Sequence, residues 1–234
     1  MSILAIDTST QWCSVALCFS DGQNYLRHEK VGNKASQVLL DWVHDLMSQS
    51  TCHWSDISSI AVSQGPGGFT GIRLGMGVAQ GLAYSQSKPL IPITSLDGMI
   101  AYQRIIHPEL FSSHHQYHVL LDARMAQVYR ASYQILATGA LQRIGNITLL
   151  NAQDIKVNTD ECYFCYDIDA YLESQGIDRQ LHHIYEATPH ALGVGFLATL
   201  EIDSHDYLPK DCQPLYVRDQ VALTIAQRSE SDLE

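Results

Sequence analysis

The chain has 234 residues, of which 46% are hydrophobic and 17% charged, and it contains 15 glycines and 7 prolines. This composition predicts a globular protein with a sizeable core, built as one large domain or two small ones, and it excludes bulk disorder. Lysine and arginine together number 14, against 25 aspartates and glutamates, which gives a net charge of −11. Because such a chain repels phosphate backbones, autonomous binding to nucleic acid is disfavoured.

The chain contains no run of about 18 apolar residues, and its start leads into an apolar segment without a basic stretch or a cleavage site. We therefore expect a soluble, cytoplasmic protein that does not enter the membrane. The six cysteines are spread along a chain that can build a core without cross-links, so we expect them to be reduced thiols.

The first half of the chain alternates between strand and helix patterns. Residues 3–6 are continuously apolar, as in a strand buried on both faces, and they end in a polar cluster at 7–10. A hairpin turn at Asp21-Gly22 joins the next two predicted strands, so the chain opens as a three-stranded meander. Strands that alternate with helices after a meander predict a mixed sheet. The further predicted elements are strands at 12–19, 24–31, 59–63 and 90–93, and helices at 36–47, 70–86 and from Ser95 onward.

A polar, histidine-rich stretch at 106–118 marks the predicted boundary between two lobes, which we place at 1–106 and 107–234. Beyond it, apolar and alternating segments between 119 and 135 predict strands, so the smaller second lobe is also expected to be α/β. The acidic tail from Ser229 is expected to fray and to carry no chemistry.

The helix predicted over 36–47 carries more apolar surface than one sheet covers. Its apolar residues span an arc of about 200°, against the roughly 100° needed to dock one helix face on a sheet. Either another helix of the same chain or another molecule covers the excess, and the sequence leaves both open. The residues considered for an outside contact are Val38, Leu39, Trp42, Val43 and Leu46, with Trp42 as the expected anchor.

The helix predicted over 70–86 has small residues at helical spacing. Gly71, Gly75, Ala79 and Ala83 fall within about 120° of one another, which lets another backbone approach closely. Glycines inside a helix cost roughly 1 kcal/mol each relative to alanine, so tight packing has to offset them. We therefore predict that the two helices together form a helix-bundle interface with a partner.

A glycine-rich loop, QGPGGFTGIR at 64–73, lies between a predicted strand and this helix, where such loops often bind phosphate. The loop lacks the lysine of a Walker motif and the third glycine of a dinucleotide fingerprint. The alternative is a tight turn in which glycines supply positive φ and Phe69 fills the core.

Actin-like and sugar-kinase-like ATPases place their first phosphate loop after the first strand, where this chain has residues 7–9. A vestigial phosphate loop is one hypothesis for this region. The other is that Asp7 is a structural acceptor for amides of the turn. The candidate phosphate-loop residues are Asp7, Thr8, Ser9, Gly67 and Gly68.

Other candidate sites are weak. His114 and His118 have the i, i+4 spacing of a zinc pair, but a strand pattern follows them immediately, so a solvated loop is the favoured alternative. Cys162 and Cys165 form one isolated pair whose apolar filling fits a packed strand. No metal, cofactor or catalytic residue is therefore predicted.

Several segments together resemble one known family. They are ILAIDTST at 3–10, GPGGFTGIRLG at 65–75 with AQGLA at 79–83, LDARM at 121–125 with Val128-Tyr129, and PLYVR at 214–218. In this order they resemble the TsaB (YeaZ) family, the dimerisation subunits of the bacterial tRNA threonylcarbamoyladenosine complex.

The resemblance implies an α/β fold of the two-lobed actin-like (RNase H-like) class, with mixed sheets flanked by helices and no working ATPase site. It also implies a non-catalytic subunit that pairs with the paralogous catalytic subunit TsaD. In the family, TsaD carries the metal and modifies the adenosine next to the anticodon of tRNAs that read ANN codons, and the ATPase TsaE joins the pair.

In such a complex tRNA is contacted only through the assembly, and the isolated chain is free to form a homodimer through the same helices. The alternative function is an actin-like or sugar-kinase-like ATPase with its own nucleotide site. The partner contacts expected from the two helices are Val38, Leu39, Trp42, Val43, Leu46, Gly71, Ile72, Arg73, Gly75, Ala79 and Leu82.

Overall fold

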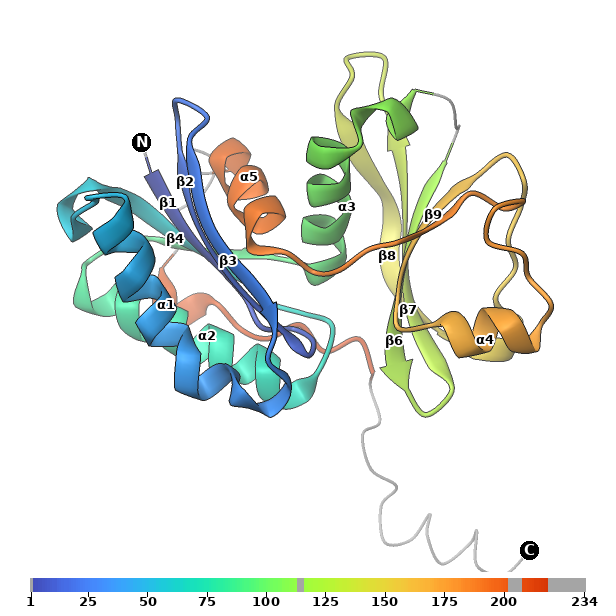
Figure 1. Cartoon of the computed structure of the whole chain (residues 1–234), viewed down its shortest axis with the longest axis horizontal. Helices are drawn as coiled ribbons and strands as arrows, with labels where there is room; N and C mark the ends of the chain where they lie inside the picture. Colours follow the sequence, from blue (N-terminus) through green and yellow to red (C-terminus); the bar gives the residue numbers. More distant parts are fainter. Residues whose placement is uncertain (1, 113–115, 202–207, 219–234) are drawn as a thin grey trace, which may run out of the picture.

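The computed structural model describes residues 2–112, 116–201 and 208–218, and it shows two lobes that each contain a five-stranded mixed sheet (Figure 1). The first sheet has the order β3-β2-β1-β4-β5 and the second the order β10-β9-β6-β7-β8. The first sheet is made of β1 (Ser2–Asp7), β2 (Trp12–Phe19), β3 (Asn24–Lys30), β4 (Ile57–Ser63) and β5 (Leu90–Ile93). The second is made of β6 (Tyr117–Arg124), β7 (Gln127–Ile135), β8 (Leu141–Asn151), β9 (Cys162–Tyr166) and β10 (Ile184–Glu186). The helices are α1 (Ala35–Gln49), α2 (Phe69–Ser85), α3 (Ser95–Ile106), α4 (Asp169–Ser174) and α5 (Ala191–Glu201).

The central strand β1 is buried on both faces, because helices cover the first sheet on both sides (Figure 1). Leu4 and Ile6 point into a core shared with α1 and α2. Ile3 and Ala5, on the opposite face, pack into a core shared with α5. The alternation of side chains along a strand therefore explains why this short segment is apolar at every position.

Helices α3 and α5 pack against each other between the two sheets (Figure 1). Their backbones approach closely, because a Cβ added at Gly193 would lie only 2.0 Å from the carbonyl oxygen of Gly98. Helix α5 follows the second sheet in the sequence but packs on the first one. The chain thus returns to the first lobe after building the second.

After α5, residues 208–218 form a segment that begins with a short 3-10 helix at Pro209–Asp211 and that we call the C-terminal strap. Gln80 of α2 donates from Nε2 to two carbonyl oxygens of the strap, and the Leu215 amide donates to Gln64 O at 2.7 Å. At its far end Arg218 donates to Ala123 O at 2.9 Å in the second lobe. The strap therefore ties the glycine loop and α2 to the turn between β6 and β7.

The expected fold class, mixed sheets flanked by helices in two lobes, is confirmed. The predicted linker at 106–118 is too long, because Tyr117 and His118 are buried in β6. The predicted division at residue 106 stays a prediction; the structure adds that α5 and the strap pack on the first lobe. No helix in the described ranges 2–112, 116–201 and 208–218 combines the length and the apolar character needed to span a membrane.

Candidate functional site

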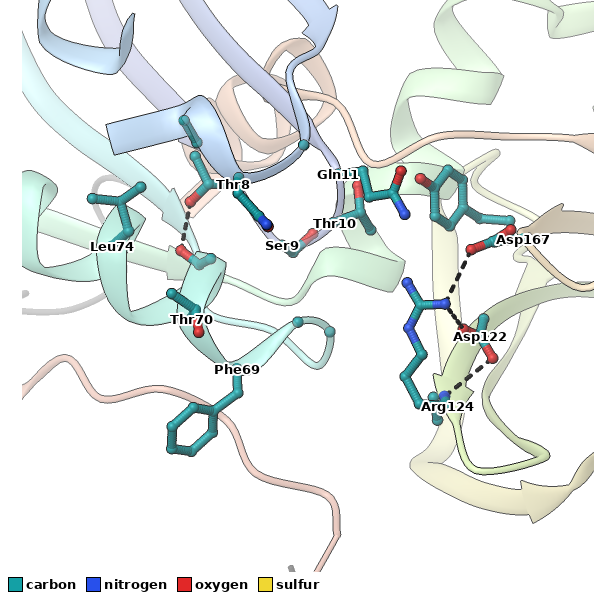
Figure 2. Close-up of a pocket in the computed structure, with 18 of the residues that line it drawn as sticks. Thr8, Ser9, Thr10, Gln11, Phe69, Thr70, Leu74, Asp122, Arg124 and Asp167 are labelled. Carbon is teal, nitrogen blue, oxygen red and sulfur yellow. Dashed lines mark hydrogen bonds and ion pairs between the residues drawn. The ribbon is translucent and has the colours of Figure 1, made fainter. Parts of the chain in front are cut away.

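A cleft with a volume of about 610 Å³ lies between the two lobes (Figure 2). Its first-lobe wall comes from the turn after β1, the glycine loop and the first turns of α2, and its second-lobe wall comes from the ends of β6 and β9. The predicted phosphate-loop residues Thr8, Ser9, Gly67 and Gly68 all line it. Asp7, the remaining candidate, is not among the lining residues.

Asp7 stabilises the turn that follows β1. Its Oδ1 accepts hydrogen bonds from the Ser9 amide at 2.8 Å and the Ser9 hydroxyl at 2.7 Å. Burial raises the pKa of the Asp7 carboxyl, while the hydrogen bonds from Ser9 and Ser63 oppose that rise. This geometry matches the structural alternative, in which Asp7 holds amides of the turn.

The turn after β1 rests directly on the glycine loop and on α2. The Gly68 amide donates to Ser9 O at 2.7 Å, and the Thr8 hydroxyl donates to Gly71 O at 2.7 Å. A Cβ added at Gly67 would lie 2.3 Å from Ser9 O, and one added at Gly71 would lie 2.0 Å from Thr8 O. These glycines are therefore explained by close approach of the chain's own backbone, and the Gly68 amide is already occupied instead of pointing at a phosphate.

The second-lobe wall is acidic. Arg124 Nη1 lies 3.1 Å from Asp122 Oδ2 and 3.5 Å from Asp167 Oδ2, so two carboxylates face one guanidinium (Figure 2). The surplus negative charge disfavours a phosphate group on this wall. Within 2–112, 116–201 and 208–218 no three His, Cys, Asp or Glu side chains are grouped so that they could hold a metal ion.

Most of the residues predicted to contact a partner are covered by their own chain, which is the first of the two coverings that the sequence left open. The apolar residues of α1 and α2 fill the core beneath the first sheet. Gly75 is needed there, because a Cβ at that position would lie 2.4 Å from the Thr8 hydroxyl oxygen. The predicted contacts that are buried in this way are Leu39, Trp42, Val43, Leu46, Ile72, Gly75 and Ala79, whereas Val38, Gly71, Arg73 and Leu82 keep some exposure.

The two helices present a different set of residues to solvent, which we call the helix-pair face. Leu40 of α1 is 55% exposed, and Leu74, Val78 and Leu82 form a half-buried row on the outer side of α2. A groove of about 580 Å³ lies at one edge of this face, where Leu40, His44 and Leu82 line it together with residues from Val43 to Trp54. The helix-pair face consists of Leu40, His44, Leu74, Gly77, Val78, Gly81 and Leu82.

Gly77 and Gly81 are the unusual members of the helix-pair face. Both are exposed, and a Cβ added at either would meet nothing within 4 Å. Each costs roughly 1 kcal/mol of helix stability relative to alanine. No tight contact within the described part of the chain offsets this loss of helix stability. The small size of these residues therefore points to close approach by another molecule.

The family model described as TsaD: tRNA N6-adenosine threonylcarbamoyltransferase matches residues 29–161, which is more than half of the chain. The chain belongs to the TsaD family. It is 38% identical over 136 residues to the "tRNA threonylcarbamoyladenosine biosynthesis protein TsaB" of Escherichia coli (strain K12), a match that covers 57% of this chain and 55% of that protein. The chain spans about half the length of the curated relatives it matches.

Two solved structures from Pseudomonas aeruginosa are similar over nearly the whole length. "YeaZ" has a TM-score of 0.77 and 28% identity, and the match covers 92% of this chain and 99% of that one. An uncharacterized protein described as similar to peptidase YEAZ has a TM-score of 0.79 and 28% identity, covering 93% of this chain and 99% of that one. The predicted resemblance to the TsaB (YeaZ) family is confirmed.

Three smaller predictions for this member of the TsaD family also have outcomes. Phe69 does not fill the core but is 49% exposed. Cys162 and Cys165 pack into cores on opposite faces of the second sheet as free thiols, as the packed-strand hypothesis predicts. His114 and the acidic tail lie outside the described residues, and His118 is not in a solvated loop but buried in β6, where its ring contacts Ser132 and Glu161.

Of the helix-pair face of this TsaD-family chain, the predicted partner contacts contain Leu82 but not the other members, because the prediction followed the densest stripe of small residues. That stripe, which includes Gly75 and Ala79, lies on the inner side of α2. Gly77 and Gly81 could have indicated this face, because glycines on an exposed side of a helix lower its stability and are explained only when something packs closely there. Only knowledge of which side of α2 is exposed turns those two residues into candidates.

Proposed function

We propose that the chain is a non-catalytic subunit of tRNA threonylcarbamoyladenosine biosynthesis that pairs with a TsaD catalytic subunit through the helix-pair face. The observation that carries this proposal is the exposed pair Gly77 and Gly81 beside a row of half-buried leucine and valine side chains. Family membership and the named activity of the relatives supply the pathway.

The helix-pair face suits a helical partner. Two helices pack with axes about 8–10 Å apart, and the smallest separations need small residues at the contact. Gly77 and Gly81 are one helical turn apart, so they make a flat strip on which another helix can lie. Leu40, Leu74 and Leu82 flank the strip and would lose their remaining contact with water when it is covered.

The wider assembly belongs to the same proposal. TsaE joins the pair, and tRNA is reached through the complex in the cytoplasm. Without TsaD the chain forms a weak homodimer through the helix-pair face, which dissociates at low concentration and leaves the face open. The lobes at 1–106 and 107–234 act together as a docking platform that holds TsaD in its competent conformation.

The competing function is an ATPase that uses the interlobe cleft. With a volume of about 610 Å³, the cleft is large enough to hold a small-molecule ligand. However, the turn after β1 is hydrogen-bonded to the glycine loop and to the first turn of α2, where a phosphate would have to bind. The second-lobe wall is acidic. We expect calorimetric titration of the isolated chain with Mg-ATP to give no tight binding and no turnover; tight binding with hydrolysis would favour the ATPase.

Co-expression with TsaD from the same organism tests the pairing. Leu40→Asp places a charge on the helix-pair face, and Leu181→Asp is a matched control, because Leu181 is 63% exposed and lies in the second lobe. Size-exclusion chromatography with mass measurement should show a heterodimer for the wild-type chain and for Leu181→Asp but not for Leu40→Asp. If Leu40→Asp still associates as tightly as the wild type, the helix-pair face is not the contact.

A further inference from the structure

A second exposed feature lies where the C-terminal strap crosses the start of α2. Phe69 is 49% exposed and Tyr216 is 48% exposed, and their ring centroids are 6.0 Å apart. The Arg73 guanidinium carbon lies 3.5 Å from the centroid of the Phe69 ring, and Arg73 Nε donates to the Tyr216 hydroxyl at 2.8 Å. We call Phe69, Arg73 and Tyr216 the aromatic–arginine patch.

The patch is held in place on both sides. Phe69 and Arg73 belong to the first turns of α2, and the strap is hydrogen-bonded just before Tyr216, where the Leu215 amide meets Gln64 O. Just after Tyr216, Arg218 donates to Ala123 O at 2.9 Å and to Gln127 Oε1 at 2.7 Å. Tyr216 is therefore fixed over α2 before any ligand arrives, which lowers the entropy cost of binding.

The patch also carries a charge that the described part of the chain does not neutralise. Arg27, Arg124, Arg143 and Arg179 each form an ion pair with an aspartate. Arg73 makes no ion pair with a carboxylate within 2–112, 116–201 and 208–218, although the whole chain has a net charge of −11. Arg104, Arg130 and Arg218 also lack an ion pair there, but they are less exposed and their guanidinium groups contact carbonyl oxygens or His118. Among the described arginines without an ion pair, Arg73 is therefore the exposed one whose charge is open to an anionic ligand.

The geometry favours a nucleotide, which combines a flat base with an anionic phosphate. Because Nε of Arg73 donates to the Tyr216 hydroxyl, an anion can pair with this guanidinium only through its Nη atoms. At 3.5 Å the guanidinium lies against the Phe69 ring. Exposed aromatic rings and arginine planes are the surfaces on which unpaired RNA bases stack.

We propose that the aromatic–arginine patch stacks an unpaired base of the tRNA substrate once the chain is bound to its catalytic partner. This inference rests on the proposed function and adds a direct RNA contact to a chain expected to meet tRNA only through the complex. Because the net charge opposes RNA, the contact contributes when the partner has already drawn the tRNA close. The patch adjoins Leu74 of the helix-pair face, so an RNA held across the complex can reach both chains.

The test measures the affinity of the purified complex with TsaD for an unmodified tRNA transcript that reads an ANN codon. Tyr216→Ala should weaken binding about tenfold, the scale of one lost base stack, and Arg73→Gln should also weaken it. Tyr216→Phe keeps the ring and should restore most of the affinity. Thermal unfolding of each variant checks that it folds. If Tyr216→Ala does not fold, the test of tRNA binding rests on Arg73→Gln.

Tyr84→Ala is the matched control. Tyr84 is 82% exposed and lies on the same side of α2 as Arg73, about three turns further along. It should change tRNA affinity less than twofold. The inference is overturned if Tyr216→Ala and Arg73→Gln bind tRNA as tightly as the wild type, or if they lose TsaD instead of tRNA, which would make the patch a protein contact. Failure of the wild-type chain to bind TsaD would overturn the proposed function, and the inference with it.

Discussion

Four glycines of α2 fall into two kinds according to what surrounds them. At Gly71 and Gly75 an added Cβ would collide with Thr8, at 2.0 Å and 2.4 Å. At Gly77 and Gly81 it would meet nothing within 4 Å. Glycine is therefore required by the fold at the first two positions, and at the other two it serves something other than this chain's own packing.

Substitution at these positions should have opposite effects on the isolated chain. Gly77→Ala should raise the free energy of unfolding by about 1 kcal/mol, because alanine has the higher helix propensity. Gly75→Ala should lower it by about 1–3 kcal/mol, because the methyl group overlaps the Thr8 side chain. Urea unfolding of both variants measures the difference. A loss of stability in Gly77→Ala would mean that the outer side of α2 is already occupied in the isolated chain.

At the scale of elements, the contact between α3 and α5 joins the two sheets through two glycines, because α3 packs on the second sheet and α5 on the first. A Cβ added at Gly193 would lie 2.0 Å from Gly98 O and 2.9 Å from the Tyr102 amide nitrogen, so backbone would have to move. We expect Gly193→Ala to destabilise the chain by about 1–3 kcal/mol or more in urea unfolding. Gly81→Ala is the control for the added methyl group alone. If Gly193→Ala and Gly81→Ala are equally stable, α3 and α5 can move apart to admit the methyl group without a loss of stability, which would contradict this expectation.

The elements themselves were largely predictable from local patterns. The strand at 90–93 and the helix starting at Ser95 have the predicted bounds, because an apolar run and a capping Thr94 define them locally. Strand β8 and helix α5 were not predicted. Helix α5 is apolar nearly all round, since it packs against both the first sheet and α3, and such a segment has no periodicity to detect.

The candidate site was less predictable than the elements. An apolar arc as wide as that of α1 shows that a helix is covered on more than one side, but it does not show by which chain. Trp42 and Leu46 are covered by their own core, whereas the exposed Leu40 falls on the outer side of the same helix. That assignment depends on tertiary contacts between α1, α2 and the sheet, which no local pattern contains.

At the scale of the whole molecule, a column of rings spans elements from both halves of the sequence. Trp12 stacks on His28 at 4.4 Å, His28 on His190 at 4.3 Å and His190 on Tyr102 at 3.8 Å between ring centroids. Burial lowers the pKa of His28 to about 4 and that of His190 to about 3. In the second lobe, burial and Arg130 lower the pKa of His118 to about 4.

These three histidines predict a loss of stability in mild acid. In the unfolded chain they bind protons near pH 6.5, whereas in the fold they stay neutral to about pH 4, so acid favours unfolding. The free energy of unfolding should be steady above about pH 7 and should fall between about pH 6.5 and 4, by at most about 1.4 kcal/mol per pH unit for each histidine. Asp7 has the opposite effect on the free energy of unfolding. Burial raises the pKa of its carboxyl, so protonation in acid stabilises the fold at this position.

Urea unfolding at about pH 7 and about pH 5 measures this dependence. His28→Gln should reduce the slope, because it removes one of the three titrating groups. A chain that is equally stable or more stable at the lower pH would contradict the neutral state assigned to the buried histidines.

The docking role of the helix-pair face is tested most directly by amide hydrogen exchange of the chain alone, at a concentration low enough to keep it monomeric, and in the presence of TsaD from the same organism. Covering the face should slow exchange in α1 around Leu40 and in α2 from Leu74 to Leu82, and leave the exposed strand β8 unchanged. Protection confined to the second lobe, or no protection in α1 and α2 when TsaD is bound, would contradict the account.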